Sequence, residues 1–152
     1  MPGDDTPAEV AADRTDDEDA TDATDHREPP IPLDGDVLRY TAATASVPPK
    51  RIAPLLRRVQ THLAPRLDAY RRAHECVVDG DERAVFLARE GHWADVGDDL
   101  DLDAREVDTV RRAHDQQLRR LGTKRGRRDE LETALDIREA VVIGVGGPAE
   151  TA

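Results

Sequence analysis

Cysteine, aromatic residues and lysine are all scarce in this chain of 152 residues, and asparagine is absent. The single cysteine, Cys76, excludes an internal disulfide and fits a reducing compartment. The longest apolar run, residues 140–147, is far shorter than the roughly 20 residues that span a bilayer. The first residues are acidic where a secretory signal needs a basic region and an apolar core. We therefore expect a cytoplasmic protein with no membrane partner.

Acidic residues are concentrated at the N-terminus. Residues 1–30 hold eleven acidic side chains against two arginines, so this segment carries −9 of the formal net charge of −11. The segment has almost no branched apolar side chain and cannot bury enough surface to offset the entropy of ordering. We predict a disordered acidic tail over residues 1–32, one α-rich domain over 33–145 and a frayed C-terminus over 146–152. The tail is either a solubilising segment or an acidic mimic that docks on a basic partner.

Apolar periodicity predicts two helices at the start of the domain. A short helix is expected over residues 36–45, with Val37 and Tyr40 facing inward. A longer helix follows Pro49, with apolar residues spaced by three and four positions along one face. Those residues are Ile52, Leu56, Val59, Leu63, Leu67 and Tyr70. Pro65 should either kink or split this helix, and the unbroken period favours a kink.

Two further segments predict β structure. Asp79-Gly80 lies between the apolar runs 76–78 and 85–87, an arrangement typical of a β-hairpin. Residues 140–143 form a buried strand that could pair with residues 84–88.

Residues 92–121 carry the clearest local signals. They predict a helix over 92–100, a tight turn, and a second helix to Leu121 followed by Gly122, where a helix often ends. Asp103 and Glu106 fit a capping box at the start of that second helix.

A last helix is expected from Asp129, with Glu132 as a second capping-box partner and with Leu131 and Leu135 buried. The predicted fold class is mainly α (α+β minor). It is a helical bundle with a helix-turn-helix-like pair and a small two- or three-stranded β element.

The pair of helices over residues 92–121 resembles the DNA-binding helix-turn-helix family over about twenty residues. The resemblance lies in small or apolar residues where the two helices would cross, namely Val96, Gly97, Leu100, Leu102, Val107 and Val110. Asp101 departs from the family pattern, which usually has glycine in the turn. The order of elements also resembles a winged helix, less closely.

The resemblance implies a groove-facing set on the second helix, comprising Asp103, Ala104, Arg105, Asp108, Thr109 and Arg112. Arginine can read guanine and threonine can contact a phosphate or a methyl group, whereas the two aspartates would repel phosphate. A helix pair that only packs together has the same apolar pattern, so both interpretations remain open.

A basic cluster follows the second helix, consisting of Arg119, Arg120, Lys124, Arg125, Arg127 and Arg128. Such a cluster can contact phosphates without sequence preference. It can also pair with nearby acidic residues such as Asp129 and Glu130, or hold the chain's own acidic tail. Together with Arg105, Thr109 and Arg112, these six residues are the candidate contacts for nucleic acid or a protein partner.

Candidate catalytic and metal sites do not meet their chemical requirements. Asp99-x-Asp101-x-Asp103 begins like a calcium loop, but Ala104 replaces the required glycine and Val110 the bidentate glutamate. The sequence has no Cys-x-x-Cys or His-x-x-x-His pair for zinc. The glycines after residue 143 precede no helix that could hold a dinucleotide. His114 lies on an apolar helix face, which predicts a hydrogen-bonded core histidine.

We therefore expect no catalytic residue, no cofactor and no metal. A concave pocket that gathers His74, His92 and Trp93 would favour an enzyme instead.

Three sequence blocks resemble those of small haloarchaeal proteins described only as domains of unknown function. They are Ser46-Val47-Pro48-Pro49, His92-Trp93-Ala94-Asp95-Val96-Gly97 and Arg111-Arg112-Ala113-His114. Arginine outnumbers lysine 20 to 2 and aspartate outnumbers glutamate 22 to 11, which is also similar to salt-loving archaea. The resemblance covers residues 33–145 and implies a discrete α-rich domain but no activity.

The expected function is a non-enzymatic structural or protein-interaction module that binds an unknown protein or itself. The alternative is a helix-turn-helix (winged-helix-like) DNA-binding regulator.

Overall fold

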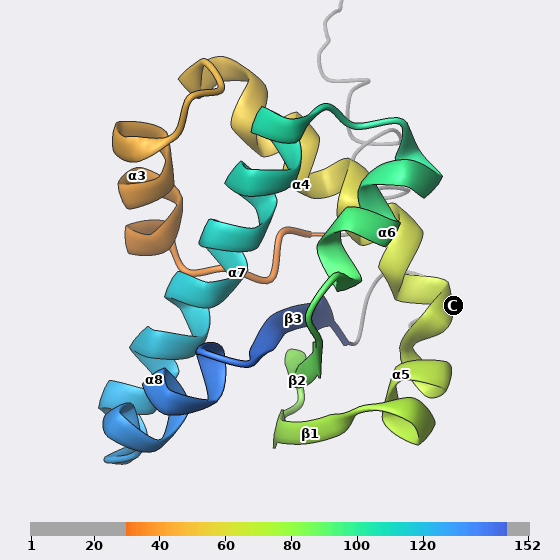
Figure 1. Cartoon of the computed structure of the whole chain (residues 1–152). Coiled ribbons are helices and arrows are strands. Elements are labelled where there is room, and N and C mark those ends of the chain that lie inside the picture. The colour runs from red at the N-terminus through yellow and green to blue at the C-terminus, as the bar shows by residue number, and fades with distance from the viewer. Residues whose placement is uncertain (1–29, 146–152) are drawn as a thin grey trace, which may run out of the picture.

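The computed structural model describes residues 30–145, in which helices pack around a small antiparallel sheet (Figure 1). The helices are α3 (Gly35–Thr44), α4 (Pro49–Leu63), α5 (Leu67–Ala73), α6 (His92–Leu100), α7 (Ala104–Arg125) and α8 (Arg128–Leu135). The strands are β1 (Glu75–Asp79), β2 (Arg83–Arg89) and β3 (Arg138–Gly144). The fold class predicted from sequence, mainly α with a small β element, is confirmed. The predicted frayed C-terminus and all but the last three residues of the predicted tail lie outside the described residues.

The three strands form one antiparallel sheet in the order β1-β2-β3. The predicted hairpin is β1 and β2, and the predicted pairing of residues 84–88 with the last strand is confirmed, with Ala84 opposite Ile143. Every residue from 84 to 88 and from 140 to 143 is buried. Both faces of β2 and β3 are therefore covered, which is why these strands are continuously apolar.

Helix α7 runs through the middle of the molecule, with α3 on one side and α6 on the other (Figure 1). It packs on β3, and α8 folds back against its C-terminal half. No helix within residues 30–145 is long and apolar enough to cross a membrane.

Two details in the first helices differ from the prediction. Pro65 lies in a single 3₁₀ turn (Ala64–Arg66) that splits the long helix into α4 and α5, the alternative to the favoured kink. Tyr40 does not face inward, because its side chain is 52% exposed. Val37 and Thr41, four residues apart, form the buried face of α3 instead, and Tyr40 lies one position away from that face.

The turn between α6 and α7 has the predicted geometry. Asp103 accepts a hydrogen bond from the Glu106 backbone N–H, and Glu106 accepts one from the Asp103 N–H, each 2.9 Å long. Asp101 adopts the left-handed conformation (φ 57°), which aspartate tolerates better than most residues. At Gly97, an added Cβ would lie 2.4 Å from Val107 Cγ2, so the helix crossing requires glycine there.

The end of α7 was predicted too early. The helix continues past Gly122 to Arg125 and is terminated by Gly126, whose φ is 70°. Gly122 serves the crossing of α7 and α8, because a Cβ there would lie 3.1 Å from Leu131 Cδ1. The second capping box is wrong as well, since Glu132 makes no cap to α8 and binds arginines instead.

Candidate functional site

The predicted groove-facing residues of α7 do not all reach the surface. Arg105 and Arg112 are exposed, and Arg112 Nη1 donates a 3.4 Å hydrogen bond to the Thr44 carbonyl oxygen at the end of α3. Thr109 is only 1% exposed, and its hydroxyl donates to the Arg105 carbonyl oxygen at 2.8 Å. Thr109 is thus removed from the set of candidate contacts, because it is buried within the fold.

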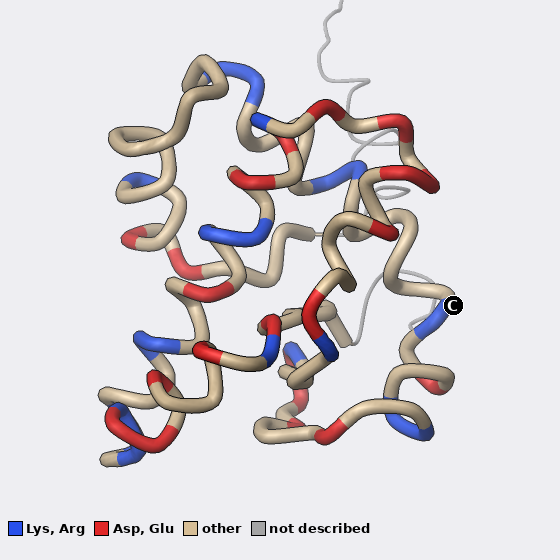
Figure 2. Tube along the Cα trace, in the orientation of Figure 1, with Lys and Arg blue, Asp and Glu red and all other residues tan. Residues whose placement is uncertain are grey.

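Acidic residues surround the end of α7 that would enter a DNA groove. The tube coloured by charge shows them along α6 and the turn that follows it (Figure 2). They are Asp95, Asp98, Asp99, Asp101 and Asp103, all of them exposed. A surface of this sign repels a phosphate backbone.

The basic cluster at the other end of α7 is largely paired with carboxylates. The ion pairs are Arg119–Glu132 (3.0 Å), Arg120–Asp34 (2.8 Å), Arg120–Asp36 (3.1 Å), Lys124–Asp34 (3.9 Å), Arg127–Glu130 (2.8 Å) and Arg128–Glu132 (3.0 Å). Within residues 30–145, Arg125 is the one member of the cluster without an ion pair. Of the three roles considered for the cluster, which were binding phosphates, pairing with acidic residues and holding the acidic tail, pairing with acidic residues therefore describes most of its members.

Asp34 joins the first described residues to α7. Its carboxylate accepts hydrogen bonds from Arg83 (3.0 Å), Arg120 (2.8 Å) and Gln117 (3.1 Å), and its N–H donates to Gln117 Oε1 (2.7 Å). Burial alone would raise the pKa of Asp34, but these three hydrogen bonds outweigh it and lower the pKa to about 2. Asp34 is therefore a charged anchor rather than a proton donor.

Two adjoining hollows lie between α3, α7 and the start of α8, and they share Gln116. Their volumes are about 290 and 370 Å³, and we call them together the α3–α7 groove. Six cations line it, namely Arg111, Arg112, Arg119, Arg120, Lys124 and Arg128. Asp36, Asp108 and Asp115 are the acidic residues of the lining. Asp34 and Glu132, outside the lining, pair with four of the cations, so the six cations exceed these five carboxylates by one.

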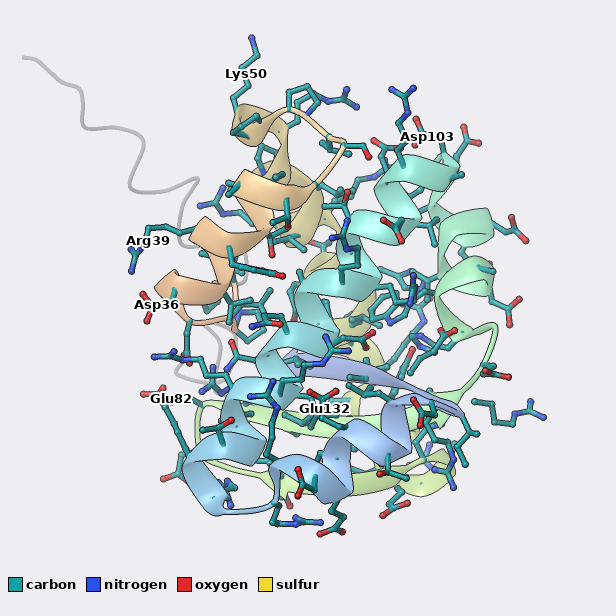
Figure 3. The ribbon with its side chains drawn as sticks, turned by 60° about the vertical axis from the view of Figure 1, so that its left-hand side comes forward. Asp36, Arg39, Lys50, Glu82, Asp103 and Glu132 are labelled. Carbon is teal, nitrogen blue, oxygen red and sulfur yellow. The ribbon has the colours of Figure 1, made fainter. Side chains whose placement is uncertain are left out.

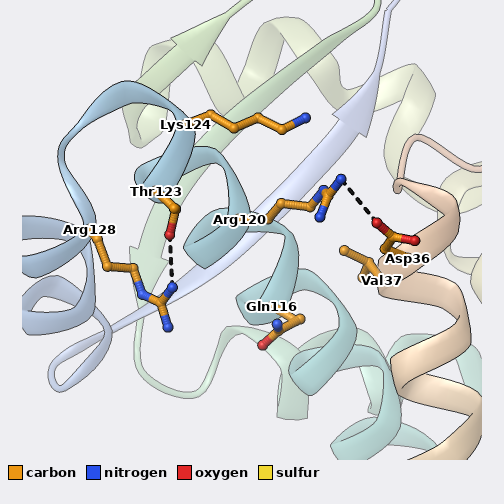
Figure 4. A pocket seen from close by; sticks show the side chains of 7 residues that line it. All are labelled: Asp36, Val37, Gln116, Arg120, Thr123, Lys124 and Arg128. Atoms are coloured by element: carbon orange, nitrogen blue, oxygen red, sulfur yellow. Dashed lines mark hydrogen bonds and ion pairs between the residues drawn. The ribbon is translucent and has the colours of Figure 1, made fainter.

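One hollow of the groove is shown from close by in Figure 4. Arg120 reaches across to Asp36 on α3, while Arg128 turns to the Thr123 hydroxyl, to which it donates a 2.8 Å hydrogen bond. Lys124 lies at the other side of the hollow, with its side chain 55% exposed. The second hollow adds Tyr40, whose half-exposed ring is the apolar part of the lining.

A second group of polar side chains is buried against the outer edge of β3. Gln60 donates to the Val142 carbonyl oxygen (2.7 Å) and accepts from the Gly144 N–H (3.1 Å). His114 Nδ1 accepts from the Val142 N–H (2.9 Å), which confirms the predicted core histidine. Trp93 donates to the Ala140 carbonyl oxygen (3.1 Å), and Asp115 accepts from the Ala140 N–H (3.4 Å). These four side chains take the place of a fourth strand.

Burial sets the protonation of the two titratable members of that group. It lowers the pKa of His114 to about 3 and raises the pKa of Asp115 to about 6. Because His114 Nδ1 accepts a hydrogen bond, the neutral imidazole carries its proton on Nε2. Both groups therefore satisfy the backbone of β3, and Asp115 also borders the second hollow of the groove, 3.8 Å from Arg111 Nη1.

His74, His92 and Trp93, whose presence around one pocket would have favoured an enzyme, lie next to one another and pack ring against ring. The His92 and Trp93 ring centroids are 4.6 Å apart, and those of His74 and His92 are 6.2 Å apart. His92 Nε2 lies 2.6 Å from the Tyr70 hydroxyl, and burial lowers the pKa of His92 to about 4. The hollows of the α3–α7 groove have none of these residues in their lining. Among the described residues there is also no group of three or more side chains that could hold a metal ion.

The sequence interpretation missed a basic stretch that covers the outer face of α4 and the 3₁₀ turn after it. Residues 49–66 contain Lys50, Arg51, Arg57, Arg58 and Arg66 and no acidic residue. All five side chains belong to exposed residues, and Lys50 projects from one end of the molecule (Figure 3). The absence of acid over eighteen residues was the available signal.

Comparison with known families agrees with the extent of the described domain. Residues 31–145 match the family described as "Domain of unknown function (DUF8048)". The chain belongs to this family. The DUF8048 domain thus includes every helix and strand described above, together with the α3–α7 groove. No curated protein and no solved structure shows significant similarity to the chain.

Proposed function

We propose that the protein is a non-enzymatic protein-interaction module, and that its α3–α7 groove binds an acidic segment of a partner protein. The observation that carries this proposal is the lining of the groove, where six cations with exposed or half-exposed side chains gather beside Tyr40 and exceed the carboxylates that pair with them. Arginine and tyrosine are enriched where proteins bind one another, because each combines a broad contact area with hydrogen-bonding capacity. Arg112 and Tyr40 supply this combination at one end of the groove.

A peptide fits the groove better than a nucleic acid. Duplex DNA presents one negative charge for about every 1.7 Å of its axis and rewards a continuous basic surface. In the groove, Asp108 lies between Arg111 and Arg112, with ion-pair distances of 2.9 and 3.5 Å. A partner with spaced acidic residues can bind the arginines and avoid this carboxylate, whereas a phosphate backbone cannot.

The buried titratable groups also support a binding role over catalysis. His114 and Asp115 bind the backbone of β3, and His92 packs between the Tyr70 and Trp93 rings. Groups that are fixed in this way hold the fold together, and Asp115 is the one of the three that also lines a hollow of the groove.

We assign this module to the cytoplasm of a salt-loving archaeon. The excess of arginine over lysine and of aspartate over glutamate, together with the single cysteine, supports this assignment.

The alternative is a helix-turn-helix DNA-binding regulator, and one observation favours it. The close approach of Gly97 to Val107 is the crossing that such a pair needs, and Arg105 is exposed on the first turn of α7. The acidic residues on α6 and in the turn oppose it, because they border the same end of α7.

A binding titration with the full chain separates the two functions. The probes are fluorescein-labelled poly-L-glutamate of about 20 residues and a labelled random duplex of the same charge. We expect poly-L-glutamate to bind, and Arg112→Glu to weaken it by at least about tenfold, which corresponds to 1.4 kcal/mol. Arg125→Glu is the matched control, since Arg125 is an exposed arginine of the same helix outside the groove lining.

If the duplex bound more tightly than poly-L-glutamate, and Arg105→Glu abolished this binding, the protein would be a DNA-binding regulator and not an interaction module. Equal effects of Arg112→Glu and Arg125→Glu would refute the groove as the binding surface.

A further inference from the structure

The outer face of α4 differs from the α3–α7 groove because most of its cations have no carboxylate partner. Among the five cations of residues 49–66, Arg51 is the one that has an ion pair with a described carboxylate, at 3.1 Å from Glu106, and Asp99 lies 3.7 Å from His62 at the side of the helix. Arg58 donates instead to the Leu100 carbonyl oxygen, and Arg66 to that of His62. These contacts orient the guanidinium groups but leave their charge uncompensated.

The cations of α4 lie in two neighbouring rows of its exposed face. Lys50, Pro54, Arg57 and Thr61 follow one another at intervals of three or four residues, and Arg51 and Arg58, seven residues apart, form the row beside them. A hollow of about 330 Å³ is lined by Pro54, Arg57, Arg58 and Thr61. The opposite face of α4 is buried in the core, so these rows are the surface that α4 offers to a ligand.

The described chain begins next to the buried side of this helix, where Gln60 contacts β3. Pro32 Cβ and Gln60 Oε1, the latter on α4, lie 3.6 and 3.8 Å from the position that a Cβ on Gly144 would occupy. Gly144 therefore has the first described residues on one side and α4 on the other. The acidic N-terminal segment, residues 1–29, continues from this point and carries eleven acidic residues against two arginines.

The length of that segment is more than sufficient to follow α4. An extended chain spans about 3.4 Å per residue, so 29 residues reach up to roughly 100 Å. The fifteen residues of α4 span about 22 Å at 1.5 Å per residue. A segment tethered beside its site has an effective concentration of the order of millimolar, so weak attraction suffices.

We propose that the acidic N-terminal segment, residues 1–29, docks on the exposed basic face of α4 of its own chain. The docked segment covers this basic face and keeps other polyanions from it. This contact is separate from the α3–α7 groove, so the proposed function stands or falls independently.

Paramagnetic relaxation enhancement in the full chain tests the proposal. Cys76→Ser removes the native thiol, Ala12→Cys takes a nitroxide label, and the broadening of the α4 amide signals is measured. We expect strong broadening at Arg57, Arg58 and Thr61 at 0.1 M salt. The broadening should fall steeply by 1 M salt, as the Debye length drops from about 10 Å to about 3 Å.

Charge reversal identifies the surface. Arg57→Glu with Arg58→Glu should abolish the broadening over α4, whereas Arg105→Glu with Arg125→Glu, two exposed arginines of α7, should leave it unchanged. The amide spectrum itself reports whether each variant is folded. Broadening that is uniform over the surface, or that survives reversal on α4, overturns the proposal.

A mixture of spin-labelled unenriched chains and unlabelled ¹⁵N chains provides the last control. Docking within one chain leaves the ¹⁵N signals sharp at low protein concentration. Broadening of α4 signals in the mixture shows docking between two copies and overturns the intramolecular contact.

Discussion

His114 should make the protein lose stability as the pH falls from 7 to 5. Its pKa is about 3 in the folded state and about 6.5 in an unfolded chain, so only the unfolded state binds a proton in this range. A histidine with these two pKa values costs the folded state about 2 kcal/mol between pH 7 and pH 5. His92, with a pKa of about 4, adds a similar amount. Asp115 opposes them by about 1 kcal/mol, because its folded pKa of about 6 exceeds its unfolded value of 3.8.

The expected net loss from these three groups is therefore about 2–3 kcal/mol, and His62 and His74, whose pKa values burial also lowers, act in the same direction. His114→Asn keeps an acceptor for the Val142 N–H without a titrating ring, and it should reduce that loss by about 2 kcal/mol. The assay is urea unfolding at both pH values, followed by the fluorescence of Trp93, the sole tryptophan. Val110→Ala, which replaces one uncharged core residue of α7 by another, is the control. It should lower the free energy of unfolding by the same amount at both pH values. If His114→Asn and the wild type lose the same free energy of unfolding, the reasoning is refuted.

Three further substitutions test the packing by urea unfolding at pH 7. Gly97→Ala should cost about 1–3 kcal/mol because its Cβ would lie 2.4 Å from Val107 Cγ2, and an unchanged midpoint would contradict the crossing of α6 and α7. Trp93→Ala should cost about 3–5 kcal/mol, since the ring is 2% exposed and is bonded to β3. Asp34→Asn should cost about 2 kcal/mol, because the pKa of Asp34 is about 2 in the folded state and 3.8 in an unfolded chain. The stability that this difference gives is present above pH 3.8 and is lost as the pH falls through 2. A cost that persisted unchanged at pH 2 would show that the charge of Asp34 is not its source.

Local signals were sufficient for most of the secondary structure. The capping box of Asp103 and Glu106 depends on residues three apart, and the Asp79-Gly80 hairpin depends on adjacent ones. Both act within a few residues, so the sequence displays them directly. The same holds for the buried strand at residues 140–143, whose continuous apolar run allows few other structures.

The errors arise where a distant segment decides the role of a residue. Gly122 matches the pattern of a helix end, but α8 packs on it, and only Gly126 has the left-handed backbone that terminates α7. Glu132 stands three residues after Asp129, but α8 begins earlier, at Arg128 with Arg127 as its N-cap, so Glu132 lies beyond the capping position. Its carboxylate pairs with Arg119 and Arg128 instead.

The cations of the candidate site could be predicted from the sequence, but their carboxylate partners could not. The cations of the cluster lie within ten residues of the chain, but Asp34, which pairs with Arg120, is 86 residues away. Net charge counted over a short window therefore overstated the free positive charge near Lys124. The polar residues on β3 follow the same rule, since Gln60 lies 82 residues from the carbonyl of Val142.

The covered edge of β3 has a consequence for self-association. A strand with unpaired N–H and C=O groups can recruit a strand from another molecule, which is how sheets grow into aggregates. On β3 those groups are already bound by Gln60, His114 and their neighbours, so a new strand could add only after α4 and α7 had moved away. β1 is protected differently, by the acidic residues at its two ends and by an irregular register between Cys76 and Val78. Growth of the sheet from one molecule to the next therefore requires the helices to detach first, a step that the whole apolar core of the domain opposes.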